Sequence, residues 1–282
     1  MRFGMNMLMW TADGTLEPIQ PLYKKIRKIG YDTVEIPLFN LDTPKLADLG
    51  KRLDDVGLER TSVTVLSKET NLISPDPAVR RAGVDYLKKV LDNARALGAT
   101  MVVGPLYAAL GEFTGKGPTA DEWAWAVEGL RAAAVHGKSV DVKLGIEFLN
   151  RFEIYLLNTA ADAARMIKDV NHPCCRMMFD TFHSHIEEKD PAAAFRACSK
   201  YVIHVHISEN DRSTPGQGNV RWKEMFAAIK KSKFKGPFVV EAFGLALPEL
   251  AAATKIWRRM YKTEEKLCAD ALAFMKKNLG SR

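Results

Sequence analysis

Cysteine is scarce in this 282-residue chain, and its four cysteines follow no recognised pattern. Cys174 and Cys175 are adjacent, while Cys198 and Cys268 stand alone, so the sequence contains no C-x-x-C metal or redox motif. A secreted disulfide framework is also excluded, because such domains are short and rich in regularly spaced cysteines. We therefore expect four reduced, buried thiols.

Long hydrophobic runs and export signals are lacking as well. The apolar run of residues 5–10 is short, and the polar residues Thr11, Asp13 and Thr15 follow before a signal-peptide core can form. No stretch reaches the roughly 18 apolar residues of a membrane span, and no Asn-x-Ser/Thr sequon occurs. These absences favour a cytoplasmic enzyme with no membrane association.

Positive charge is in excess but is not concentrated in any one segment of the chain. The chain has 41 Lys and Arg against 34 Asp and Glu, a net charge of +7, and the basic residues are scattered along the sequence. Because nucleic-acid binding normally needs a basic patch or stripe, we expect no nucleic-acid partner. With 47% hydrophobic and 27% charged residues, the composition excludes intrinsic disorder and suits a large buried core.

Motifs of several common enzyme classes are missing. The sequence has no G-x-S-x-G nucleophile elbow and no H-E-x-x-H zinc motif. Residues 111–117 read G-E-F-T-G-K-G, which is one residue short of a phosphate-binding P-loop and lacks its Ser or Thr. The chemistries of these three motifs are therefore not supported.

The sequence does contain a regular alternation of short apolar, β-branched runs with longer amphipathic stretches, as is typical of repeated βα units. Strands are expected at residues 2–10, 33–37, 60–66, 100–105, 143–149, 176–180, 202–207 and 238–242. Helices are expected at residues 16–29, 43–56, 77–97, 119–138, 159–168, 191–198 and 222–230, with a long C-terminal helix from about 248 onward.

Eight βα units predict an α/β fold, a (β/α)8 TIM barrel, as a single catalytic domain over residues 1–282. A doubly wound open sheet is the alternative, but that fold normally begins with a Gly-rich phosphate turn. The first expected strand is instead followed by Thr-Ala-Asp-Gly-Thr at residues 11–15. No linker or low-complexity segment divides the chain.

Four polar residues stand at the ends of the fifth to eighth expected strands: Glu147, Asp180, His206 and Glu241. Active-site residues of TIM barrels project from these strand ends, so the four should meet on one rim. Any one of them alone is more simply a helix cap or a surface residue. Three carboxylates in a confined mouth repel one another unless a cation is bound, and oxygen and nitrogen ligands without sulfur favour Mn²⁺, Mg²⁺ or Co²⁺. His204 shares the face of His206 and is interpreted as structural.

Three further polar residues follow these strand ends and are candidates for substrate contacts. His183 is expected in the loop after the sixth strand, with support of Asp180 as its alternative role. Glu153 lies in the loop after the fifth strand, where a network with Arg151 is the alternative. Arg212 follows the seventh strand, and its planar guanidinium suits sugar oxygens or a phosphate unless it is a surface arginine.

Several segments spread over most of the chain form a specific set of motifs. They are Ser-Pro-Asp at 74–76, Ile-Glu-Phe-Leu-Asn-Arg-Phe-Glu at 146–153, Phe-Asp-Thr-Phe-His at 179–183, Ile-Glu-Glu at 186–188, His-Val-His at 204–206, Glu-Asn-Asp-Arg at 209–212, Pro-Gly-Gln-Gly at 215–218, Val-Glu-Ala-Phe at 240–243 and Trp-Arg at 257–258. This set resembles the ketose 3-epimerases, namely the D-tagatose, D-allulose (psicose) and L-ribulose 3-epimerases of the xylose isomerase-like TIM-barrel superfamily.

The resemblance implies a Mn²⁺-dependent epimerisation at C3 of a free keto-sugar, with no organic cofactor. It implies that the metal is held by Glu147, Asp180, His206 and Glu241, and that the two glutamates also act as acid and base.

The resemblance further implies that Glu153, His183 and Arg212 hold the oxygens around C1 to C3, and it suggests a homodimer or homotetramer. Two positions depart from the family pattern, because Asn6 and Leu110 stand where relatives often carry aromatic residues. We interpret these departures as lost aromatic walls around the far end of the sugar. They concern the preferred ketose and leave the reaction type unchanged.

Three alternatives stay open at this point. One is a related sugar isomerase of the hydroxypyruvate or xylose type, or an epimerase of a modified or phosphorylated sugar. Another is an endonuclease-like barrel that cleaves DNA, although its three-zinc site needs more histidine ligands than the six histidines present supply. The third is a binding module without catalysis, which would leave the acidic and imidazole groups without a cation.

Overall fold

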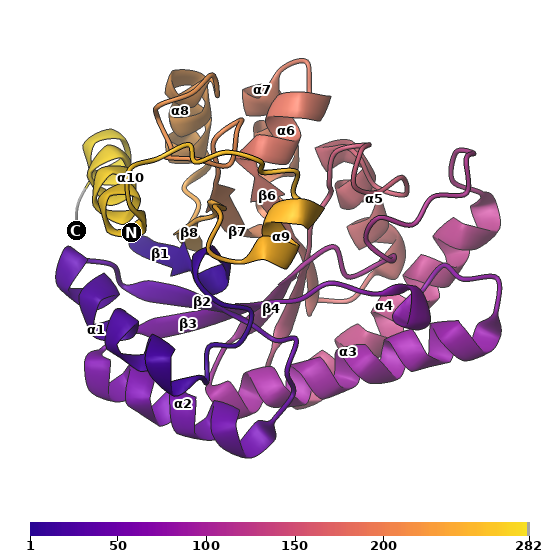
Figure 1. Cartoon of the computed structure of the whole chain (residues 1–282). Coiled ribbons are helices and arrows are strands. Elements are labelled where there is room, and N and C mark those ends of the chain that lie inside the picture. Colours follow the sequence, from indigo (N-terminus) through magenta and orange to yellow (C-terminus); the bar gives the residue numbers. More distant parts are fainter. Residues whose placement is uncertain (281–282) are drawn as a thin grey trace.

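Eight parallel strands close into a barrel in the computed structural model, which describes residues 1–280. They are β1 (Arg2–Asn6), β2 (Thr33–Pro37), β3 (Glu59–Val63), β4 (Met101–Gly104), β5 (Lys143–Ile146), β6 (Cys175–Asp180), β7 (Val202–Ile207) and β8 (Pro237–Val240). Each strand pairs with the next in the sequence, and β8 pairs with β1. The predicted TIM barrel is therefore confirmed, and Figure 1 shows its strands surrounded by helices.

The outer layer consists of helices that connect successive strands or follow the last one (Figure 1). They are α1 (Gln20–Ile29), α2 (Thr43–Val56), α3 (Pro77–Leu97), α4 (Ala120–Ser139), α5 (Ala160–Val170), α6 (Thr181–Glu187), α7 (Pro191–Cys198), α8 (Trp222–Ser232), α9 (Pro248–Ala253) and α10 (Glu264–Leu279). Short 3₁₀ helices lie at Met7–Met9, Glu17–Ile19, Lys68–Thr70 and Ser199–Tyr201. Three expected helices, 43–56, 77–97 and 191–198, have the predicted bounds.

The helix boundaries follow the capping residues in the sequence. The Asp76 side chain accepts a hydrogen bond from the Ala78 amide at the start of α3, and Pro77 occupies the first turn. Gly98 ends the same helix in the left-handed conformation, as Gly30 does after α1. A side chain that caps a helix start stabilises it by about 1 kcal/mol, so these signals fix where the connections run.

The expected long C-terminal helix is wrong in its extent. It is divided into α9 and α10, because α9 ends at Ala253 and Lys255, two residues further on, adopts a left-handed conformation. Helix α10 then begins at Glu264, capped by Thr263, whose side chain accepts a hydrogen bond from the Lys266 amide. The Tyr31 hydroxyl donates to the Cys268 carbonyl at 2.9 Å, so α10 packs where the first and last βα units meet.

Alternation along the strands places the polar candidates inside the barrel. Phe179 of β6 points outward and packs edge-on against Phe195 of α7, with ring centroids 5.1 Å apart. It also packs against Phe148 at 5.5 Å. Because neighbouring residues of a strand face opposite sides, Asp180 and Glu147 are directed to the barrel interior while their aromatic neighbours anchor the outer layer.

The cysteines take no part in disulfide bonds. Cys175, Cys198 and Cys268 are buried, whereas Cys174 is half-buried, so the expectation of four buried thiols holds for three of them. Burial raises the pKa of the Cys175 and Cys198 thiols to about 12. They are therefore packing residues that stay protonated at neutral pH.

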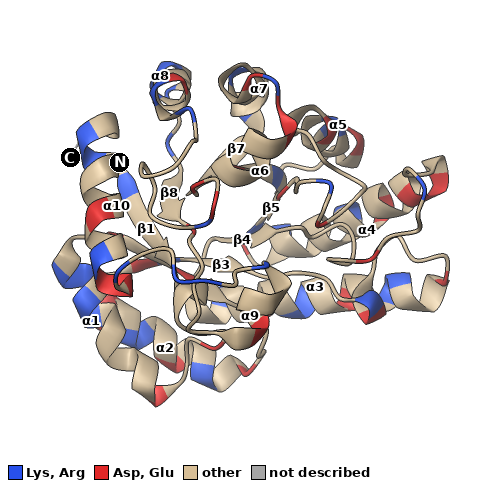
Figure 2. Cartoon of the chain, turned by 45° about the horizontal axis from the view of Figure 1, so that its top comes forward, with Lys and Arg blue, Asp and Glu red and all other residues tan. Residues whose placement is uncertain are grey.

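Charges of both signs are interspersed on the outer helices (Figure 2). Among the helices of residues 1–280, none combines the length and the apolar character needed to cross a membrane.

Gly104 is the residue whose lack of a side chain matters most directly for the mouth of the barrel. It ends β4 with φ +129°, and a Cβ there would lie 2.2 Å from the Thr64 carbonyl oxygen. Its own carbonyl accepts the Glu147 amide at 2.9 Å. We expect Gly104→Ala to lower the free energy of unfolding by about 3 kcal/mol through strain and overpacking.

Urea denaturation measures this effect. Gly117→Ala is the matched control, because a Cβ there meets nothing within 4 Å, and it should change stability by less than about 0.5 kcal/mol. Equal stability of the two variants would contradict the assigned role of Gly104.

Candidate active site

The structure brings the four strand-end candidates together at one end of the barrel. Glu147 directly follows β5, Asp180 ends β6, His206 lies in β7 and Glu241 directly follows β8. One ligand atom from each lies within 4.8 Å of those of the others. His206 Nδ1 is central to the group, 3.4 Å from Asp180 Oδ2, 3.4 Å from Glu241 Oε1 and 3.9 Å from Glu147 Oε1.

These four side chains are buried and incompletely satisfied. None is more than 6% exposed, yet Glu147 Oε1 and His206 Nδ1 have no hydrogen-bond partner among the described residues. An unpaired buried polar atom costs about 1–3 kcal/mol. Two such atoms aimed at a common centre, together with the oxygens of Asp180 and Glu241, fit a divalent cation.

Without a cation, the charges of the four side chains are not balanced, as the pKa shifts of Glu147, Glu241 and His206 show. Burial and the nearby Glu241 carboxylate raise the pKa of Glu147 well above its usual value. Although burial opposes ionisation of Glu241, His206 and Arg212 lower its pKa to about 2. Burial lowers the pKa of His206, but the Glu241 and Glu35 carboxylates raise it by more, so it lies well above its usual value. Ionisation of the Glu147 carboxyl group is thus disfavoured, and a divalent cation bound among the four side chains would favour it. Three oxygens and one nitrogen without sulfur form a donor set suited to Mn²⁺, Mg²⁺ or Co²⁺.

Arg212 lies beside this group and is not a surface residue, since only 6% of it is exposed. Its guanidinium donates to Asp180 Oδ2 at 3.1 Å and closely contacts Glu241 Oε2. Phe182 and Phe243 lie against it, with ring centroids 3.8 and 5.0 Å from the guanidinium carbon. The arginine therefore supplies fixed positive charge to two of the candidate metal ligands.

The loop that carries Arg212 is held by a buried carboxylate that the sequence analysis did not single out. Glu209 accepts hydrogen bonds from the Gly216 and Val220 amides and from the Trp222 indole, at 2.7, 3.0 and 2.8 Å. Arg212 itself has the left-handed φ of +62°. Such a conformation persists only when the surroundings enforce it, and the Glu209 network does so.

His183 belongs to a helix and not to the expected loop. It lies in α6, which starts directly after β6 because the Asp180 side chain caps it by accepting from the Phe182 amide. His183 Nδ1 accepts from the Asn150 amide at 3.0 Å. Its Nε2 lies 2.9 Å from Arg212 Nη2 and 3.7 Å from Glu147 Oε1, so the ring stands between the guanidinium and the edge of the carboxylate group.

Glu153 is half-buried in the turn after β5, where its Oε1 accepts from the Asn150 side chain at 2.8 Å. The alternative network between Glu153 and Arg151 is wrong, because Arg151 pairs with Glu187 at 2.7 Å. Glu153 keeps its second oxygen available for a ligand, since Oε2 has no hydrogen bond among the described residues.

The two departures from the family pattern lie in different places. Asn6 is fully buried, and its side-chain amide donates to Glu241 Oε1 at 3.2 Å, so the interpretation that this position concerns a wall lost at the far end of the sugar is wrong. Leu110 is 37% exposed in the loop after β4. Asn6 therefore belongs to the candidate metal centre.

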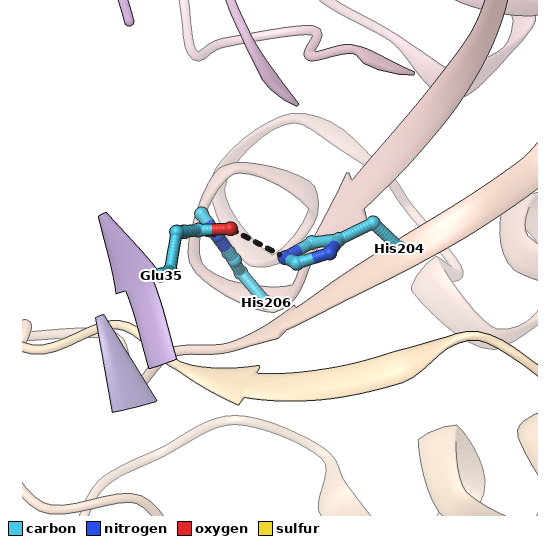
Figure 3. A group of neighbouring side chains, drawn as sticks. All are labelled: Glu35, His204 and His206. Atoms are coloured by element: carbon cyan, nitrogen blue, oxygen red, sulfur yellow. Dashed lines mark hydrogen bonds and ion pairs between the residues drawn. The ribbon is translucent and has the colours of Figure 1, made fainter. Parts of the chain in front are cut away.

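A second buried group lies directly beneath the first and includes a residue that the sequence analysis missed. Glu35 of β2 meets His204 and His206 of β7, and all three are fully buried (Figure 3). The available signal was a charged residue in the middle of the apolar strand Thr-Val-Glu-Ile-Pro, because a buried charge needs partners.

Comparisons with known proteins agree with this geometry. The family model of the xylose isomerase-like TIM barrel matches residues 23–277. A ketose 3-epimerase from Arthrobacter globiformis is 31% identical over 99% of this chain and 97% of its own length. An L-ribulose 3-epimerase from Methylomonas sp. is 29% identical over 98% of this chain and 97% of its own length. The solved structure of an L-ribulose 3-epimerase superposes with a TM-score of 0.93 and 30% identity, covering 99% of this chain and 94% of that one.

The chain belongs to the xylose isomerase-like TIM barrel family. Within it, the resemblance to the ketose 3-epimerases that the motifs carried is confirmed by these full-length relatives.

Proposed function

We propose that the protein is a ketose 3-epimerase, an isomerase that interconverts the C3 epimers of a free keto-sugar with a divalent cation. The single observation that carries this proposal is the meeting of Glu147 and Glu241, from β5 and β8, in one buried four-ligand group. The relatives named ketose, L-ribulose and D-psicose 3-epimerase support the reaction class. A related epimerase structure was solved in complex with D-allulose, which supports a sugar of this kind.

Glu147, Asp180, His206 and Glu241 would hold the cation. When bound, it supplies Lewis acidity worth several kcal/mol toward negative charge on neighbouring substrate oxygens. Mn²⁺ is the proposed ion, with Mg²⁺ or Co²⁺ as substitutes, and no organic cofactor is required.

The two glutamates carry the proton transfer. The C3–H next to a ketone is a weak carbon acid, so one carboxylate takes that proton and leaves a planar enediolate. The other glutamate, in its acid form, returns a proton to C3 from the opposite face and becomes a carboxylate. Both then re-equilibrate with solvent, and the net change is inversion at C3.

The remaining candidates orient the sugar. His183 and the Arg212 guanidinium adjoin the four-ligand group, and Glu153 lies in the turn that follows Glu147. We assign these three side chains to the oxygens of C1 to C3. Fixed geometry of this kind lowers the barrier, because the reacting atoms are held in line before the proton moves.

A panel of free ketohexoses and ketopentoses tests the proposal. Proton NMR in D₂O should show C3 epimers with deuterium at C3, lost in EDTA and restored by Mn²⁺. Deuterium at C1 would instead identify an aldose–ketose isomerase, and turnover of only phosphorylated sugars would identify an epimerase of modified substrates. Full activity in metal-free protein would overturn the mechanism.

The homodimer or homotetramer and the cytoplasmic location are further parts of the proposal. Light scattering after size-exclusion chromatography measures the assembly, for which two or four copies are expected.

A further inference from the structure

His206 presents its two ring nitrogens to different surroundings. Nδ1 faces the carboxylates of Asp180 and Glu241, at 3.4 Å from each. Nε2 lies 2.7 Å from Oε1 of Glu35, which reaches across the barrel from β2. The imidazole is thus placed between a candidate metal centre and a buried carboxylate that belongs to no role assigned so far.

The Glu35 carboxylate is surrounded by donors on both oxygens. Oε1 accepts from Asn6 Nδ2 at 3.0 Å in addition to His206 Nε2. Oε2 accepts from the Thr61 hydroxyl at 2.9 Å and lies 3.0 Å from His204 Nε2, the contact drawn in Figure 3. The hydrogen bonds from Asn6, Thr61 and His206 stabilise the charged form of this carboxylate, which offsets the large cost of burying it.

The orientation of Asn6 is itself determined. Its Oδ1 accepts the Leu8 amide at 2.8 Å, so its NH₂ group must face the carboxylates of Glu35 and Glu241. The same amide therefore connects the carboxylate behind His206 to one of the candidate metal ligands.

By composition, Glu35, His204 and His206 are also a group that could hold a second cation. The hydrogen bonds argue against this, because Asn6 and Thr61 direct N–H and O–H donors at Glu35. A cation bound there would face the positive ends of those donors, whereas a carboxylate that accepts hydrogen bonds is satisfied by them.

We propose that Glu35 is a positioning residue of the metal centre: it accepts the Nε2–H of His206 and so fixes the ring with its Nδ1 lone pair directed at the site formed with Glu147, Asp180 and Glu241. A metal-binding histidine commonly donates its other N–H to a carboxylate or carbonyl, which fixes the tautomer and ring orientation. The proposal rests on the metal centre of the proposed function, and it extends that centre to a residue of β2, a strand that supplies none of the four candidate ligands.

Metal titration of variants provides the first test, with Mn²⁺ binding followed by electron paramagnetic resonance and calorimetry. Glu35→Leu should weaken Mn²⁺ binding by about 10- to 100-fold. Glu35→Gln keeps an oxygen that can accept from His206 and should recover most of this loss. Thr61→Val is the matched control, because it removes a donor from Oε2 without touching His206, and its affinity should stay within about threefold of wild type. Equal affinities for wild type and Glu35→Leu would overturn the proposal.

The wild-type protein provides a second test that does not depend on the folding of a variant. In ¹⁵N-labelled protein loaded with diamagnetic Mg²⁺, long-range proton–nitrogen NMR should place the His206 proton on Nε2. One ion per chain is expected by elemental analysis. A proton on Nδ1, or two ions per chain, would overturn the role of Glu35. If the wild type binds no divalent ion at all, both the proposed function and the role of Glu35 are overturned. If it binds one ion but the proton lies on Nδ1, only the role of Glu35 is overturned, so the two failures are distinguishable.

Discussion

Replacing either Glu147 or Glu241 by glutamine should lower kcat for C3 epimerisation by about 10²–10⁴-fold, the contribution expected of a positioned acid or base. A glutamine keeps a side-chain oxygen at the centre but cannot exchange a proton with C3. Because the two residues act on one reaction, the double variant should be little worse than either single one. Initial rates in both directions measure the effect, and Glu249→Gln on exposed α9 is the control.

Isotope exchange separates the two glutamates. Each single variant retains one carboxylate, which can still remove and return the C3 proton on its own face of the sugar. In D₂O, each variant should therefore incorporate deuterium into only one of the two epimers, and the two variants should label opposite ones. Metal content must be equal in the samples compared. Labelling of the same epimer by both variants would contradict a position for Glu147 and Glu241 on opposite faces.

Arg212→Leu should lower the free energy of unfolding by about 3–5 kcal/mol in EDTA, because removing one partner of a buried ion pair leaves the other unpaired. Arg212 is in contact with Asp180 and Glu241, both buried carboxylates. With Mn²⁺ the loss should become smaller, since the ion then balances the same carboxylates. Activity should fall as well, because this guanidinium is assigned to the substrate oxygens.

Urea denaturation with and without Mn²⁺ measures these effects. Arg221→Leu is the matched control, because the exposed Arg221 side chain pairs only with Glu224 within residues 1–280, and it should cost less than about 0.5 kcal/mol. A loss of under 1 kcal/mol for Arg212→Leu in EDTA would show that the arginine does not balance the carboxylates.

The barrel and its rim could be predicted because they depend on short-range patterns. Glu147, Asp180, His206 and Glu241 each follow an apolar run, and parallel strands bring such ends to one edge. Asp180 also caps α6, which leaves no loop between strand and helix. That dual role explains why His183 was expected in a loop and lies in a helix instead.

The support behind the rim could not be predicted from the same patterns. Glu35 meets His206 only because the barrel closes through the pairing of β8 with β1, which brings β2 within side-chain reach of β7, a relation that no local spacing contains. The sequence left open whether Arg212 is a surface residue or a site residue, because its burial depends on Phe182 and Phe243, which come from separate βα units. Long-range packing determined what the sequence left open.

Crystals of the protein soaked with Mn²⁺ and a ketose, examined by anomalous scattering at the manganese edge, test the central claim most directly. The account predicts a single strong peak shared by Glu147, Asp180, His206 and Glu241, with C3 of the sugar lying between the two glutamate carboxylates. A peak elsewhere, or a sugar whose C3 faces only one glutamate, would contradict it.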